Sequence, residues 1–298
     1  MTTDIVREGR LQVVSDYAEL LKPSITFLVL VTALAGSVLA LNGPIPWWAL
    51  IHMLVGTALC SGGASALNQY IERDLDGLMR RTQDRPLPSG RLEPRHALIY
   101  GVAVCLAGTA YLFAFTNTTT AGLAAFTIAS YLFVYTPSKR LTWWSTIIGA
   151  VPGAMPPVIG WAAVRSEAGP EAWVLFGIMY LWQIPHFLAI AWMYRADYAR
   201  AGFPVLPVTD PDGVRTSRHI TGNCLALLAF SLVPTWLGLT GKVYFFGALV
   251  LGVAFLAFGV ATAVSRTNLS AKRLLLASIV YHPLLLVLIL VDAAPGWF

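Results

Sequence analysis

Charged residues are scarce in this sequence. Of its 298 residues only 12% are Asp, Glu, Lys or Arg, whereas 57% are hydrophobic, and the mean hydropathy is +0.67. A soluble domain carries about 25% charged residues. The composition therefore excludes a water-soluble globule, a disordered chain and a conventional nucleic-acid-binding protein. We expect an integral membrane protein whose surroundings are the lipid bilayer.

Cysteine is scarce as well. Cys60, Cys105 and Cys224 each lie in an apolar run, and no two of them form a Cys-x-x-Cys pair. This pattern indicates neither a disulfide framework nor a zinc site. Residues 1–21 contain four acidic residues and no apolar core, unlike a transit peptide or a secretory signal. We therefore expect a prokaryotic host in which the first membrane segment is retained.

Long apolar runs take the place of charge. A helical crossing needs about 20 residues, and these runs are continuous rather than alternating as in a β-barrel. They predict an all-α polytopic membrane protein, a single domain over residues 1–298 with nine transmembrane helices around a lipid-accessible cavity. The expected spans are residues 24–42, 47–70, 97–115, 121–136, 142–163, 171–194, 219–240, 243–264 and 274–292.

Basic residues alternate between the connections of these nine helices. Eighteen of the 20 Lys and Arg residues fall on one side, and only Arg165 and Lys242 fall on the other. By the positive-inside rule, segment 1–21 and the loops 71–96 and 195–218 are cytoplasmic. Topology by itself therefore explains most loop arginines. The protein is predicted to lie in the plasma or inner membrane, with an active site at these two loops facing the cytoplasm.

Three oxygen-bearing side chains stand at helical spacing where the second span ends. Asn68, Glu72 and Asp76 follow each other at intervals of four residues, so on a helix they share one face along about 12 Å. Mg²⁺ prefers such hard oxygen ligands and usually takes one or two carboxylates, with water and phosphate oxygens as its other ligands. The alternative is a solvated helix end whose acids pair with nearby arginines.

A cluster of arginines follows this motif within ten residues. Arg81 and Arg85 lie in it, and Lys139 and Arg140 add charge on the same side of the membrane. Guanidinium groups bind phosphate through two parallel hydrogen bonds. The sequence contains no glycine-rich phosphate loop, so it does not indicate an ATPase.

Together these residues resemble a known family. The pattern Asn68-x-x-x-Glu72-x-x-x-Asp76, followed by Arg81-Thr-x-x-Arg85-Pro-Leu, is similar to the first polar motif of the UbiA-type intramembrane prenyltransferases, and most similar to the haem branch, which farnesylates protohaem IX. Further stretches that carry the resemblance are Lys22-Pro23, Tyr135-Thr-x-x-Lys139-Arg140, the Gly- and Pro-rich residues 149–161, Trp182-Gln-x-Pro-His186-Phe, and residues 197–207.

The resemblance implies a reaction and a site. A farnesyl group passes from farnesyl diphosphate to the 2-vinyl group of haem B (protohaem IX) with addition of water, giving haem O and diphosphate. Asn68, Glu72 and Asp76 would then hold Mg²⁺, and Asp197 is a candidate for a second metal position. The candidate contacts of the diphosphate are Arg81, Arg85, Lys139 and Arg140. A haem A synthase is a candidate partner that receives the product.

One position departs from the related enzymes that prenylate aromatic acids. Those enzymes carry a second Asp-x-x-x-Asp motif, whereas Asp197 is followed four residues later by Ala201. The difference fits the haem branch, and it leaves the ligands of the second metal open.

Two features inside the predicted spans allow two interpretations each. His186 is a polar residue in a span, which is by default a functional residue; it either faces haem, at the iron or a propionate, or bonds to a neighbouring helix. The prolines and glycines of residues 149–160 either break the helix beside a cavity or permit close helix packing.

Two other functions remain open. A sister prenyltransferase acting on 4-hydroxybenzoate, a quinone precursor or chlorophyllide would share the diphosphate chemistry. A transporter would also have many spans and a proline-broken helix, but its charged groups should lie near the midplane. Here nearly all of them gather at one surface, which favours an enzyme.

Overall fold

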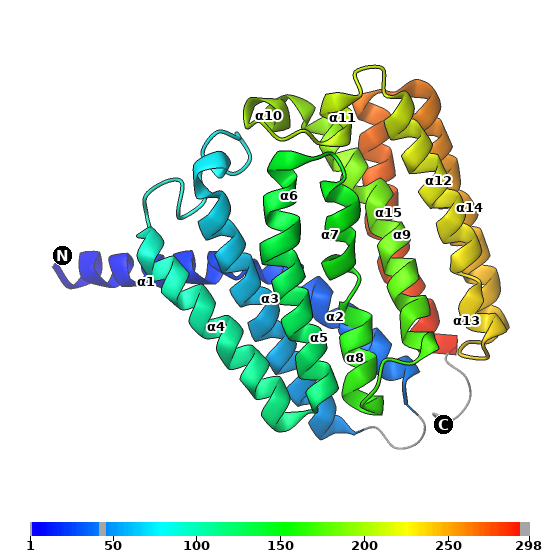
Figure 1. The fold of residues 1–298 in the computed structure, drawn as a ribbon, viewed down its shortest axis with the longest axis horizontal. Helices are drawn as coiled ribbons and strands as arrows, with labels where there is room; N and C mark the ends of the chain where they lie inside the picture. Colours follow the sequence, from blue (N-terminus) through cyan, green and yellow to red (C-terminus); the bar gives the residue numbers. More distant parts are fainter. Residues whose placement is uncertain (1, 42–45, 293–298) are drawn as a thin grey trace.

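The protein is a bundle of helices (Figure 1). The computed structural model describes residues 2–41 and 46–292, and these contain helices and no strand. The first half consists of α1 (Thr2–Leu20), α2 (Pro23–Leu39), α3 (Trp47–Asp76), α4 (Pro94–Phe115), α5 (Thr118–Ala129), the π-helix η1 (Ser130–Tyr135) and α6 (Thr136–Leu141). The second half consists of α7 (Ser145–Gly153), α8 (Pro156–Arg165), α9 (Pro170–Met193), α10 (Arg195–Arg200), α11 (Leu206–Thr209), α12 (Val214–Phe230), α13 (Val233–Trp236), α14 (Lys242–Ser265) and α15 (Asn268–Asp292).

Seven helical segments of the described chain are long and apolar enough to cross a membrane, and the number rises to eight if a bent pair counts as one span. The all-α, multi-pass class is therefore confirmed, whereas the number of nine transmembrane helices is not. The two spans that fall short are α2 and α12, with 17 residues each. Helix α2 reaches the length of a crossing only with the end of α1, across a bend of 46°. The side on which the N-terminus lies remains a prediction.

Proline sets several helix starts. Pro23, Pro94, Pro156 and Pro170 each stand in the first turn of a helix, where the missing N–H has no partner to lose. Pro156 separates α8 from α7, so the expected span at residues 142–163 is broken in its middle.

The sequence left two roles for the glycines of residues 149–160, a helix break beside a cavity or close helix packing, and the structure shows both roles. A Cβ on Gly160 would collide with the carbonyl oxygen of Ala33, so this glycine lets α8 pack closely on α2. Gly149 and Gly153, with Pro152 between them, line the cavity described below, and a Cβ on either would also collide with a neighbouring side chain.

The two long polar loops expected from the sequence lie at the same end of the bundle and contact each other. The first follows α3, and the second contains α10 and α11 (Figure 1). Helix α3 continues to Asp76, beyond its expected end at residue 70, because Glu72 and Asp76 are buried against cations instead of facing water. The first loop is thus residues 77–93, and its Met79 packs with Phe203 and Val205 in one buried cluster.

Candidate functional site

One face of α3 forms the long wall of a cavity of about 390 Å³, a size typical of ligand sites. Its lining residues recur every three or four positions from Thr57 to Asp76, a helix length of about 28 Å. Small side chains such as Ala64 occupy the first part, and Asn68, Glu72 and Asp76 occupy the last. The cavity therefore changes from weakly polar to charged along its length.

Three other parts of the bundle contribute apolar side chains to the cavity walls. Helix α2 contributes Ile25 and Val29, the α7–α8 break contributes Pro152 and Pro156, and α9 contributes Phe187. These side chains are apolar. The end of the cavity away from the acids can therefore hold a hydrocarbon chain.

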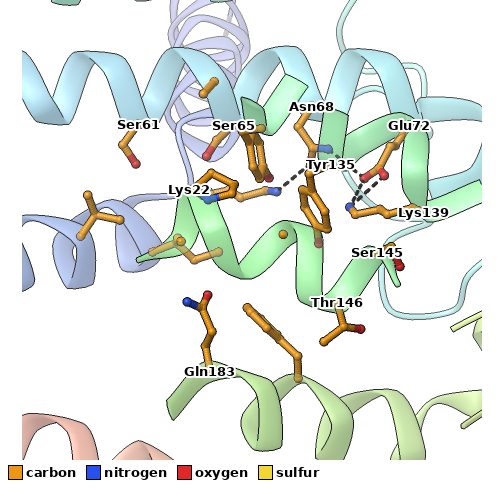
Figure 2. A pocket seen from close by; sticks show the side chains of 18 of the residues that line it. Lys22, Ser61, Ser65, Asn68, Glu72, Tyr135, Lys139, Ser145, Thr146 and Gln183 are labelled. Atoms are coloured by element: carbon orange, nitrogen blue, oxygen red, sulfur yellow. Dashed lines mark hydrogen bonds and ion pairs between the residues drawn. The ribbon is translucent and has the colours of Figure 1, made fainter. Parts of the chain in front are cut away.

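The three oxygen-bearing residues of α3 line the same cavity, as their spacing predicts. Figure 2 shows two of them, Asn68 and Glu72, side by side. Asn68 Nδ2 donates to Glu72 Oε2 at 3.0 Å. Glu72 and Asp76 are only 6% and 2% exposed, so the alternative of a solvated helix end does not describe them.

Each of the two acids is paired with a cation from outside its own helix. Lys139 Nζ lies 2.8 Å from Glu72 Oε1, and Arg85 Nη1 lies 2.6 Å from Asp76 Oδ2. The arginines nearest in sequence do not take this role: Arg73 lies beside the exposed Asp74 instead.

The π-helix η1 precedes the helix that carries Lys139. A π-helical turn inside an α-helix frequently occurs at functional sites, and this one places Tyr131 and Tyr135 on the cavity wall. Lys139 Nζ lies 4.7 Å from the centre of the Tyr135 ring. We did not assign either tyrosine to the site from the sequence. Tyr135 could have been predicted, because it stands four residues before Lys139 and so shares its helix face.

At the charged end of the cavity, Arg81 contacts the loop that contains α10 and α11. Its Nη2 donates to the hydroxyl of Tyr198 at 2.7 Å, and its guanidinium lies over the same ring at 4.9 Å. Both residues line the cavity.

Lys22 is a further cation of the cavity that we did not assign to the site. It stands between α1 and α2 in the left-handed region, with φ 47° and ψ 66°, which is uncommon for a residue other than glycine. Its Nζ lies 3.5 Å from Asn68 Oδ1 (Figure 2). The only signal in the sequence was the Lys22-Pro23 pair before the first apolar run.

Three predicted residues are not among those that line the cavity: Arg140, His186 and Asp197. Arg140 is exposed, and Asp197 accepts a hydrogen bond from Arg200 Nη1 at 3.0 Å. His186 Nδ1 lies 2.7 Å from Ser278 Oγ on α15. A bond to a neighbouring helix, the second of our two interpretations, describes its position.

The donor set of the charged end fits Mg²⁺. Within the described chain no three His, Cys, Asp or Glu side chains form a complete metal site. At the charged end of the cavity, two carboxylates and the amide of Asn68 do lie together, which suits an ion that keeps waters and binds substrate phosphate oxygens. The charged side chains of the lining are four cations and two carboxylates, so a polyanionic ligand is favoured.

Comparison with known proteins gives consistent relationships. Residues 29–282 match the UbiA prenyltransferase family. A protein of Solibacter usitatus named protoheme IX farnesyltransferase is 50% identical over 290 residues, which cover 94% of this chain and 99% of that protein. One of the same name from Koribacter versatilis is 42% identical over 300 residues, covering 97% and 96%.

A solved structure has the same fold. A UbiA homologue from Archaeoglobus fulgidus bound to GPP and Mg²⁺ superposes with a TM-score of 0.65 at 16% identity, covering 92% of this chain and 99% of that one.

Proposed function

This chain belongs to the UbiA prenyltransferase family, and on that basis we propose that it transfers the farnesyl group of farnesyl diphosphate to the 2-vinyl group of haem B. Water adds in the same reaction, giving haem O and diphosphate. The names of relatives 50% and 42% identical over nearly the whole chain support this acceptor and donor. The observation that carries the proposal is a single cavity with a cationic end and an apolar remainder, which matches a prenyl diphosphate.

The cationic end binds the diphosphate in this proposal. Breaking the allylic C–O bond builds negative charge on the leaving diphosphate, and fixed cations lower that barrier by binding the developing charge. Lys139, Arg85, Arg81 and Lys22 all line this end. Arg140, His186 and Asp197 have no substrate contact in this arrangement, because they lie outside the lining.

Asn68, Glu72 and Asp76 would hold Mg²⁺ together with the diphosphate oxygens. The Archaeoglobus fulgidus homologue bound to GPP and Mg²⁺ supports a metal in the family. A bound Mg²⁺ supplies Lewis-acid stabilisation of the leaving group. The acids are held for this purpose on one face of α3, and their present partners are the same cations that would contact the phosphates.

The apolar end holds the farnesyl chain. Transfer of its fifteen carbons from water is worth at most about 12 kcal/mol, at roughly 0.8 kcal/mol for each carbon. The farnesyl chain therefore partitions into the bilayer, and its enclosure by side chains such as Ile25, Val29 and Phe187 limits hydrolysis of the allylic cation.

The protein is a multi-pass membrane protein. We further propose that it lies in the plasma membrane of a bacterium with the charged end of the cavity at the cytoplasmic surface. The bacterial relatives support the plasma membrane, and the positive-inside rule supports this orientation. A haem A synthase that takes up the product remains a predicted partner.

The test is a reconstitution of the purified protein in lipid nanodiscs with farnesyl diphosphate, haem B and Mg²⁺. We expect haem O by mass spectrometry, and none when farnesyl diphosphate is omitted. Parallel reactions with 4-hydroxybenzoate or chlorophyllide as acceptor distinguish the sister activities. Prenylation of one of these acceptors without haem O would overturn the proposal.

A further inference from the structure

The reacting carbon of a prenyl diphosphate is the one bonded to the diphosphate. The chemistry therefore takes place where the charged end of the cavity meets the apolar part. On the α3 side of this boundary lie Lys22 and Asn68, and Gln183 of α9 lies across the cavity from them (Figure 2). A polar side chain at this place is unnecessary for holding a hydrocarbon chain.

The carboxamide of Gln183 is held in one orientation. Its Nε2 donates to Ala150 O of α7 at 2.9 Å and to Met179 O of its own helix at 3.1 Å. Both donor hydrogens are thus used, and the two carbonyl oxygens around Nε2 decide which end of the amide is nitrogen. The acceptor Oε1 receives no hydrogen bond from the described residues, although Gln183 is only 3% exposed.

Gly153 makes room for that oxygen. A Cβ at this position would collide with Gln183 Oε1, and Gly153 itself lines the cavity at the break between α7 and α8. The backbone and the amide therefore together place an unused acceptor at the cavity wall.

We propose that Gln183 is a positioning residue which, through Oε1, holds the water that adds to the vinyl group of the acceptor. This rests on the proposed function. The farnesyl C–O bond breaks with its electron pair going to diphosphate, and the vinyl π pair forms the new bond to the farnesyl carbon. The vinyl carbon next to the porphyrin ring is left as a cation. The lone pair of the water forms the C–O bond there, and the released proton goes to diphosphate.

A neutral amide suits this position. It accepts a hydrogen bond from the water and so directs the water's lone pair, while a carboxylate at the same place would itself be a nucleophile for the allylic cation. The two acids of the cavity, Glu72 and Asp76, are held by cations at its other end. Without a held water the vinyl-derived cation loses a proton to diphosphate instead, which gives a farnesylated product lighter by one water.

The ratio of hydrated to dehydrated product tests the role of Gln183. Gln183→Leu removes the acceptor, and Gly153→Ala keeps it but displaces it, because the added Cβ would stand where Oε1 now lies. In both variants we expect the dehydrated fraction to rise about tenfold, the size of effect that one hydrogen bond supports.

The outcomes separate this inference from the proposed function. Suppose that the unaltered protein farnesylates haem B, and that both Gln183→Leu and Gly153→Ala give the same ratio of hydrated to dehydrated product as the unaltered protein. The proposed role of Gln183 is then wrong, and the proposed function stands. If the unaltered protein yields no farnesylated haem, the function itself is wrong. A Gln183→Leu protein that does not fold leaves Gly153→Ala to decide.

Discussion

Lys139 Nζ lies 2.8 Å from Glu72 Oε1 and 2.9 Å from Glu72 Oε2, although the two residues are 67 positions apart in the chain. Arg85 and Asp76 form the second such pair. In these pairs the proposed ligands of the metal neutralise the proposed ligands of the diphosphate. Binding of Mg²⁺ with a prenyl diphosphate would exchange the partners, the acids turning to the metal and the cations to the phosphate oxygens.

Replacing Asp76 tests the metal-binding role of the α3 ridge. We expect Asp76→Ala to lower prenyl transfer roughly a hundredfold or more, because stabilisation of the leaving group is lost. Asp74→Ala is the matched control, since Asp74 lies two residues away with a side chain that is 78% exposed. Rates of haem O formation measure both, with thermal unfolding to show that each variant is folded. Near-normal turnover by Asp76→Ala would contradict the assignment.

Lys139 and Arg140 are neighbours in the sequence, and replacing each in turn tests which of them contacts the diphosphate. A charge-assisted hydrogen bond contributes about 1.5–3 kcal/mol, so Lys139→Gln should raise the KM for farnesyl diphosphate roughly 10- to 100-fold. Arg140→Gln should leave the KM unchanged, because Arg140 is exposed and outside the cavity lining. Steady-state kinetics at saturating haem B give both values. An equal effect of the two changes would restore Arg140 to the site, as the sequence alone had suggested.

Ligand binding should stabilise the protein cooperatively. Mg²⁺ alone competes with Lys139 and Arg85 for the acids, so we expect it to change the unfolding temperature little. Mg²⁺ with an unreactive farnesyl thiodiphosphate satisfies both sets of groups, and at a hundred times its Kd a ligand stabilises by about 2.7 kcal/mol. Thermal unfolding in nanodiscs compares the two additions with the analogue plus a chelator. A full shift from Mg²⁺ alone would argue against the exchange of partners.

His186 should act in packing rather than in haem binding. The hydroxyl of Ser278 donates to Leu275 O at 2.6 Å, so its oxygen accepts the hydrogen bond from His186 Nδ1. A partly buried hydrogen bond contributes about 0.5–1.5 kcal/mol, and both His186→Ala and Ser278→Ala should lower stability by about this amount. The absorption spectrum of added haem should be the same for both variants and the unaltered protein. A changed spectrum in His186→Ala alone would indicate that the imidazole contacts haem.

Local patterns determined the class of protein and the core of the site. Apolar runs of membrane length predicted the all-α bundle because lipid offers backbone groups no hydrogen-bond partners. The interval of four residues placed Asn68, Glu72 and Asp76 on one face because the periodicity of a helix is a local property. In the structure that shared face lines one cavity.

Which side chains oppose that face was decided only by tertiary structure. Helical spacing says which residues share a face, but it does not say which other helix packs against it. The left-handed turn that carries Lys22 and the hydrogen bond of Gln183 to Ala150 of α7 belong to this packing. So does the exclusion of Arg140 and Asp197, whose charges resemble those of the site in sequence but are directed elsewhere in the fold.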